Sequence, residues 1–105
     1  MKDVSIMNWS QYDEANQIIS KLLNGQLQVF RDKMVGFYLY GSLIWGDFDM
    51  ASSDIDTLCV LSSEVTSNEI VFLRIMHEEI VKESPVWRDR IEVHYASIDG
   101  LKNFR

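Results

Sequence analysis

Two short motifs in this sequence carry residues that could act together on a nucleotide. The first is Tyr40-Gly41-Ser42, a Gly-Ser turn after an apolar run, and the second is Asp54-Ile55-Asp56, which opens another apolar run after eleven intervening residues. A glycine turn lets backbone N–H groups approach a phosphate closely, and paired carboxylates supply the oxygen ligands that Mg²⁺ accepts. The two motifs together indicate metal-assisted chemistry on a nucleotide, which neither indicates alone.

The two aspartates are expected to point to one face of a strand. Side chains alternate along a strand, so Asp54 and Asp56 would lie on the same side, about 6.6 Å apart, with Ile55 pointing into the core. Two such carboxylates repel each other unless a cation bridges them. Glu92, which lies between two apolar residues of a later strand, is the candidate third carboxylate. Three carboxylates could hold two Mg²⁺ ions that act on the attacking and leaving oxygens.

Gly41 and Ser42 are the candidate nucleotide-binding residues. Glycine lets the backbone approach the ligand, and Ser42 can donate its hydroxyl hydrogen to a phosphate. If a helical turn starts at Leu43, its free N–H groups would face a triphosphate. Ser42 as a covalent nucleophile is a further possibility, but no Gly-x-Ser-x-Gly pattern surrounds it.

A second pair of acids, Asp47 and Asp49, has the same spacing but lies in a loop flanked by glycine and serine residues. No sheet sets the geometry of this pair, so we interpret both residues as solvated loop acids. The corresponding alternative for Asp54 and Asp56 is a turn acid followed by an acid at the edge of a strand. The nearby Gly-Ser turn favours the metal-binding interpretation.

The histidines and the single cysteine do not indicate a zinc site. His94 shares a strand face with Glu92, but we expect a partly buried, hydrogen-bonded histidine; His77, in a helix, is expected at the surface. Cys59 lies in an apolar run and is expected to be a small buried hydrophobe. Neither histidine pairs with Cys59 at metal-ligand spacing. Three tryptophans could stack on a base, although packing is their more common use: Trp9, Trp45 and Trp87.

Length and composition predict one ordinary globular domain over residues 1–105. The chain is 47% hydrophobic and 25% charged, and its one cysteine excludes an intramolecular disulfide. No run approaches the roughly 18 apolar residues of a membrane span, and the N-terminus lacks the features of a signal peptide, so a cytoplasmic protein without a membrane partner is expected. The net charge of −6 argues against binding long nucleic acid and would suit a cationic partner.

Hydrophobic periodicity predicts an α/β (α+β) fold with the element order α-β-β-α-β-α. The first helix is expected to be capped by Ser10 and to break or bend at Asn24-Gly25, and the second to open with a capping box of Thr66 and Glu69. The middle strand is nearly all apolar and is expected to be buried on both faces. The expected ranges are helices 10–31, 66–83 and 97–104, strands 35–40, 55–61 and 90–95, and one helical turn at 43–46.

The combination of Gly41-Ser42 with Asp54-Ile55-Asp56 before an apolar strand resembles the signature of the nucleotidyltransferase superfamily typified by DNA polymerase β. The stretch from Tyr38 to Asp49 looks more specifically like the aminoglycoside adenylyltransferases of the streptomycin/spectinomycin type. Arg90-Ile91-Glu92-Val93 resembles that family's later strand, which carries its catalytic glutamate. The resemblance covers roughly residues 30–105 and implies the nucleotidyltransferase fold, a small mixed sheet with helices packed on it.

The resemblance also implies an enzyme and a role for each candidate residue. Asp54 and Asp56 would bind Mg²⁺, and Gly41 with Ser42 would bind the phosphates of ATP. Glu92 would complete the metal site and take the proton of the acceptor hydroxyl. That oxygen would attack the α-phosphate and release pyrophosphate, so that AMP passes to a small molecule such as an aminoglycoside. Catalysis would rest mostly on positioning and electrostatics.

One departure concerns the helical C-terminal domain that closes over nucleotide and drug in this family. The sequence ends at Arg105, about where that domain would begin, so we expect a homodimer or a helical partner to supply the missing wall. The alternatives are a minimal nucleotidyltransferase that acts as an antitoxin or adenylylates a protein, and an inactive fragment. Minimal antitoxin forms usually carry an arginine soon after the Gly-Ser, where this chain has Leu43-Ile44-Trp45.

Overall fold

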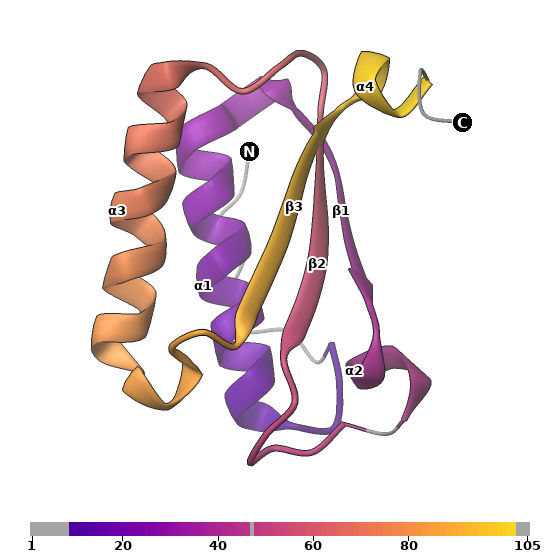
Figure 1. Ribbon diagram of the computed structural model, residues 1–105, viewed down its shortest axis with the longest axis vertical. Helices are drawn as coiled ribbons and strands as arrows, with labels where there is room; N and C mark the ends of the chain where they lie inside the picture. Colours follow the sequence, from indigo (N-terminus) through magenta and orange to yellow (C-terminus); the bar gives the residue numbers. More distant parts are fainter. Residues whose placement is uncertain (1–8, 47, 103–105) are drawn as a thin grey trace.

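A three-stranded mixed sheet with helices packed on it organises the chain (Figure 1). The structure, a computed structural model, describes residues 9–46 and 48–102, of which the side chains of Trp45, Leu101 and Lys102 are not described. The elements follow one another as α1 (Asp13–Phe30), η1 (Arg31–Lys33), β1 (Met34–Tyr40), α2 (Ser42–Trp45), β2 (Ile55–Leu61), α3 (Ser67–Glu83), η2 (Pro85–Trp87), β3 (Ile91–Ser97) and α4 (Ile98–Lys102).

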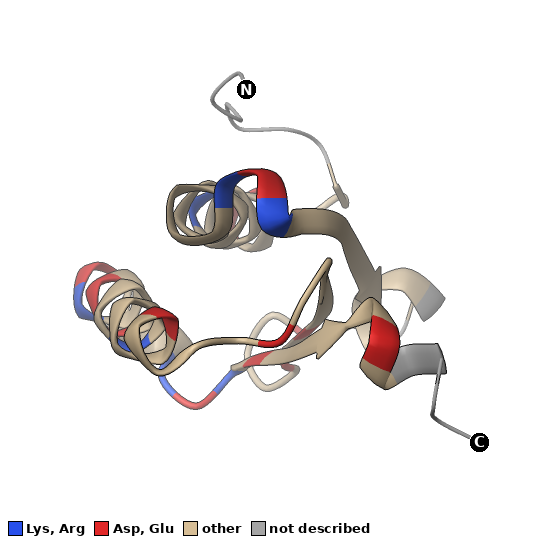
Figure 2. Cartoon of the chain, turned by 90° about the horizontal axis from the view of Figure 1, so that it is seen from above, with Lys and Arg blue, Asp and Glu red and all other residues tan. Residues whose placement is uncertain are grey.

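The central strand of the sheet is β2, which pairs antiparallel with β1 and parallel with β3. The long helices α1 and α3 pack over the same face (Figure 2), while α2 and α4 lie at opposite ends of the sheet (Figure 1). The mixed α/β architecture expected from the sequence is therefore confirmed. Because β1 runs opposite to the other two strands, the end of β1 meets the starts of β2 and β3.

The middle strand is not equally buried on its two faces, contrary to the expectation from its apolar sequence. On the helix side, Ile55, Cys59 and Leu61 are all 0% exposed. On the opposite side, Asp56 and Leu58 are only half-buried, and only Val60 is buried. The reason is that α1 and α3 cover one face only (Figure 2), so Asp56 on the other face stays partly exposed.

The first helix begins later than predicted and does not break. Ser10 does not cap it; its hydroxyl instead donates to Asn16 Oδ1 at 2.9 Å, and the N-cap residue Tyr12 makes no side-chain cap. The helix runs straight through Asn24-Gly25, although glycine is a poor helix former. A Cβ at Gly25 would collide with the side chain of Met76, so glycine permits the close approach of α1 and α3.

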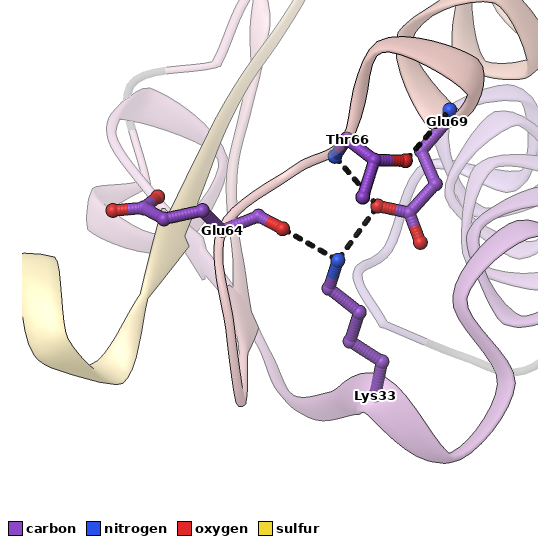
Figure 3. A network of polar contacts seen from close by, with 4 residues as sticks. All are labelled: Lys33, Glu64, Thr66 and Glu69. Carbon is purple, nitrogen blue, oxygen red and sulfur yellow. Dashed lines mark hydrogen bonds and ion pairs between the residues drawn. The ribbon is translucent and has the colours of Figure 1, made fainter.

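The predicted capping box at the start of α3 is confirmed, and a lysine from η1 completes it (Figure 3). The Glu69 backbone N–H donates to Thr66 Oγ1, and the Glu69 carboxylate accepts from the Thr66 N–H at 2.9 Å. Lys33 Nζ lies 2.7 Å from the same carboxylate and also donates to the Glu64 carbonyl. The Lys33 and Glu69 side chains are only 16% and 18% exposed, so this ion pair is largely shielded from water.

Replacing Lys33 with methionine should destabilise the protein by about 1–3 kcal/mol, because the Glu69 carboxylate would keep its burial and lose its cation. Chemical denaturation at neutral pH would measure the loss. Lys21→Met is the matched control, since Lys21 pairs with Glu83 at 3.5 Å between side chains that are 42% and 67% exposed. Such a surface pair contributes about 0–1 kcal/mol. Equal losses in the two variants would contradict the prediction.

Several predicted boundaries and faces require correction. The strand predicted from residue 90 begins at Ile91, because the Arg90 N–H still donates to the Trp87 carbonyl of η2. In α3 only part of the apolar side faces the core: Leu73 and Ile80 are buried, but Phe72 and Ile75 are 57% and 52% exposed. The terminal helix is Ile98–Lys102, and the last two residues of its predicted range lie outside the described residues.

Among the described residues, none of the helices has the length and apolar content that crossing a membrane would require.

Candidate active site

The Gly-Ser turn lies directly against the second aspartate of the later motif. The chain leaves β1 at Tyr40 and turns at Gly41, whose φ of 79° and ψ of −155° favour glycine, and α2 then starts at Ser42. A Cβ on Gly41 would collide with Asp56 Oδ2 and would lie 3.2 Å from its Cγ. The glycine is therefore required by a carboxylate of the chain itself, in addition to its positive φ.

Asp56 lies between the two outer strands of the sheet at this end. Its Cα is the register partner of Tyr40 on β1 and of Glu92 on β3. Register partners in adjacent strands project to the same face, so the Asp56 and Glu92 carboxylates share the open face of the sheet. Ile55 is fully buried on the other face, as predicted. The structure therefore brings together the Gly-Ser turn, Asp56 and Glu92, which are far apart in the sequence.

The Asp56 carboxylate lies close to two other carboxylates, Glu92 and Asp54, and its pKa responds to both burial and these charges. Its pKa is raised above the usual value of 3.8, first by burial, then by a hydrogen bond and repulsion from Glu92 and by repulsion from Asp54. His94 acts in the opposite direction. The pKa of the Tyr40 hydroxyl is also raised, by burial and by the negative charges of Asp56 and Glu92. This end of the open face therefore concentrates negative charge.

Asp54 lies just before β2, where the sheet does not fix its side chain. Within residues 9–46 and 48–102, no three histidine, cysteine, aspartate or glutamate side chains converge on a single metal position. The Glu92 side chain is 55% exposed, which leaves it free to change rotamer. The donor set is nevertheless of the right chemistry for Mg²⁺, which prefers carboxylate oxygens and retains several waters.

The loop that delivers Asp54 is held by Arg90. Its guanidinium donates to the Ser53 carbonyl at 2.7 and 3.0 Å and to the Met50 carbonyl at 2.8 Å. The same group lies 4.4 Å from the ring centroid of Trp87, which is 2% exposed. Arg90 therefore fixes the loop that leads to the aspartate motif. It immediately precedes β3, the strand that carries Glu92.

The loop acids behave as predicted where they are described. Asp49 Oδ1 accepts the Ala51 N–H at 2.8 Å, so this side chain organises a local turn and does not join the carboxylates of the sheet. Asp47, the other member of the pair, lies outside the described residues.

Both histidine predictions were wrong. His94 is 61% exposed and lies 3.4 Å from the Glu92 carboxylate through its Nε2, so it borders the candidate site and is not partly buried. His77 is half-buried, and its Nε2 lies 2.8 Å from the Tyr95 hydroxyl. Burial lowers the pKa of His77, which is expected for an imidazole that loses contact with water.

The cysteine prediction is confirmed, and the tryptophans pack as far as they are described. Cys59 is 0% exposed, and burial raises the pKa of its thiol to about 12. Trp87 belongs to the core, and Trp9 packs edge-on against Phe37 with ring centroids 6.0 Å apart. The side chain of Trp45 lies outside the described part of the chain.

No family model, no curated protein and no solved structure matches this chain.

The geometry adds to the candidate site two residues that were not predicted from the sequence. Tyr40 is 39% exposed and lies beside Asp56 on the open face, and Arg90 holds the loop before Asp54. The register between β1 and β2 identifies the first, and hydrogen bonds across 37 and 40 residues identify the second. In the sequence, Tyr40 could have been recognised from its position next to the Gly-Ser turn, whereas no sequence signal indicated Arg90.

Proposed function

We propose that this protein is a Mg²⁺-dependent nucleotidyltransferase that transfers AMP from ATP to a hydroxyl group of a small molecule, with an aminoglycoside as the acceptor class. The observation that carries the proposal is the position of Asp56, which lies against the Gly41 turn and beside Glu92 across the sheet. The Gly41 turn, Asp56 and Glu92 thus share one end of one open face, which supports their proposed roles as phosphate-binding turn, metal ligand and base.

The residues fit the proposed chemistry through their donor atoms. Asp54, Asp56 and Glu92 would hold the metal. The pKa of Asp56 is raised first by burial and then by Glu92 and Asp54, and a cation would relieve the repulsion from those two carboxylates. When bound, Mg²⁺ supplies charge stabilisation for the phosphoryl oxygens. Gly41 and Ser42 bind and orient the phosphates of ATP. Glu92 accepts the proton of the acceptor hydroxyl, whose oxygen bonds to the α-phosphorus as the bond to pyrophosphate breaks.

The charge of the site supports a cationic acceptor. Asp56 and Glu92 lie on an open face, and the whole chain carries a net charge of −6. An aminoglycoside carries several amino groups, so the field of this face would raise its local concentration before any specific contact forms.

Glu92→Gln should lower the rate of AMP transfer by about 100-fold or more, which is the usual effect of removing a general base. The assay is Mg²⁺-dependent release of pyrophosphate from ATP with streptomycin and spectinomycin as acceptors, with labelled ATP to locate the product. Glu79→Gln is the control, because Glu79 is an exposed carboxylate of α3. The absence of transfer to any hydroxyl acceptor, or equal rates in wild type and Glu92→Gln, would contradict the proposed function. Labelling of the protein in place of the drug would favour a protein-adenylylating module.

A further inference from the structure

The outer edge of β3 is an unpaired strand edge. In the described sheet β3 pairs only with β2, and the Ile55 N–H donates to the Arg90 carbonyl at 2.8 Å. Backbone groups alternate in direction along a parallel strand, so the N–H and C=O groups of Ile91, Val93 and Tyr95 point away from β2. No other described segment forms a backbone ladder with this edge. These groups are therefore available to a further strand.

Two cavities follow this edge between β3 and α3. One has a volume of about 480 Å³ and an almost wholly apolar lining that includes Ile70, Leu73 and Tyr95. The other has a volume of about 360 Å³ and lies at the start of the strand, beside Trp87, Asp89 and Ile91. Arg74 and His77 line both cavities. The edge is thus accompanied by an apolar hollow at one end and, at the other, by a more polar hollow whose mixed lining includes charged residues.

The two cavities form a groove along β3, and the charged residues that line it are not all paired. Arg88 is paired with Glu78 at 3.1 Å. The Arg74 side chain is exposed and makes no ion pair or hydrogen bond with the other described residues, although it lies where the two cavities meet. Asp89 lies at the polar end and is exposed. A ligand that complements this groove must therefore carry an apolar group, then a negative charge, then a positive charge.

A strand is the ligand whose side-chain spacing matches this order. Ile91 and Tyr95 are four residues apart, which is about 13 Å along a strand. Side chains at positions i, i+2 and i+4 of an added strand share one face, so one could fill the apolar cavity, the next could face Arg74 and the third could reach Asp89. Strand addition of this kind obtains affinity from main-chain hydrogen bonds and specificity from pockets for alternate side chains.

We propose that the outer edge of β3 binds an extended peptide as a fourth strand, with an apolar side chain beside Tyr95, a carboxylate against Arg74 and a basic side chain toward Asp89. Antiparallel addition is the more stable arrangement and gives the peptide order apolar-x-acid-x-base from N- to C-terminus. A second copy of β3 does not fit as well, because its side chains on this face are Ile91, Val93 and Tyr95 and offer no carboxylate to Arg74. The two cavities that would take these side chains lie on the helix-covered face of the sheet, opposite the open face that carries Asp56.

The probe is the synthetic peptide acetyl-Thr-Leu-Thr-Asp-Thr-Lys-Thr-amide with a fluorescent label, and fluorescence anisotropy measures its binding. We expect a dissociation constant of about 10–100 μM, because the contact area is small. Arg74→Glu should weaken binding at least tenfold, and a peptide with lysine in place of the aspartate should recover affinity for that variant. Lys82→Glu is the matched control, since Lys82 is exposed on the same helix but lines neither cavity.

Backbone methylation separates strand addition from simple charge attraction. In the proposed register the N–H of the peptide aspartate points to β3 and the N–H of the adjacent threonine points away. N-methylation at the aspartate should abolish binding, whereas N-methylation at that threonine should leave it within about twofold. Equal binding of the two methylated peptides, equal binding by wild type and Arg74→Glu, or no binding at 1 mM peptide (an order-of-magnitude limit) would overturn the proposal. A dimer in sedimentation whose formation prevents the peptide from binding would assign the edge to a second copy and would also overturn it.

Discussion

Asp56→Asn is expected to abolish Mg²⁺-dependent ATP binding and AMP transfer while making the protein without ligand more stable. In wild type the Asp56 carboxylate is half-buried and faces the charges of Glu92 and Asp54, which raise its pKa together with burial. Like charges directly opposite in a sheet cost about 0.2–1 kcal/mol, and asparagine removes that repulsion. Loss of a group that only supports a metal ligand lowers metal affinity or activity by about 10–100-fold. Loss of the ligand itself should therefore lower them by at least about 100-fold.

The stability difference should depend on pH in a defined direction. Because the pKa of Asp56 is raised in the folded state, the folded protein holds this proton more tightly than the unfolded chain. The associated stability is therefore present below the unfolded pKa of about 3.9 and is lost as pH rises through the folded pKa. Wild type and Asp56→Asn should accordingly unfold alike near pH 4 and diverge toward pH 7, where the variant is more stable.

Thermal unfolding across this pH range, with and without ATP and Mg²⁺, tests both halves of the prediction. Ligand should raise the melting temperature of wild type, because it binds only the folded state, and should leave that of Asp56→Asn unchanged. Glu79→Gln, which changes an exposed carboxylate of α3, should behave as wild type in both respects. If Asp56→Asn binds ATP and Mg²⁺ as wild type does, then Asp56 is not a metal ligand and the site is wrongly assigned.

Gly41→Ala is expected to destabilise this protein strongly. The backbone at Gly41 has φ 79° and ψ −155°, a region that is essentially reserved for glycine and costs other residues about 1–3 kcal/mol. The added methyl group would also collide with the Asp56 carboxylate. We expect a loss of at least about 2 kcal/mol, or about 10–15 °C in melting temperature, together with loss of ATP binding.

Gly46→Ala separates the two causes. Gly46 also has a positive φ of 90°, but a Cβ at this position would meet nothing within 4 Å, so only backbone strain remains. The double variant Gly41→Ala, Asp56→Ala removes the colliding carboxylate and should recover part of the loss, which a double-mutant cycle measures as a coupling energy. A loss in Gly41→Ala no larger than in Gly46→Ala, without coupling to Asp56, would show that the turn does not pack against the carboxylate.

Features that depend on neighbouring residues could be predicted from the sequence. The bounds of β2 agree with the predicted strand, because an apolar run between polar residues is a local signal. The capping box of Thr66 and Glu69 is likewise a pattern over four residues, and it is present in α3. The predicted helical turn after Gly41 also exists as α2.

Features that depend on what lies opposite were mispredicted. The apolar sequence of β2 suggested burial on both faces, but the fold supplies one helical layer, and the other face stays open. The apolar residues of α3 are likewise not all buried: Phe72 and Ile75 are exposed, because α1 covers only part of that helix. His77 was expected at the surface and is half-buried, and His94 was expected to be partly buried and is exposed. The reason is the same: burial is set by the neighbouring element and not by the residues beside them in the sequence.

The sequence by itself determined the inventory of this protein: a glycine turn, an Asp-x-Asp pair at the start of a strand, and a glutamate within a later strand. These are short-range patterns, which the backbone preferences of a few residues suffice to specify. Only the tertiary structure decided that Asp56 lies between Tyr40 and Glu92, that Gly41 packs against its carboxylate, and that Arg90 holds the loop before it. Strand order, register and the crossing of α3 set these contacts, and they arise from the burial of one shared core.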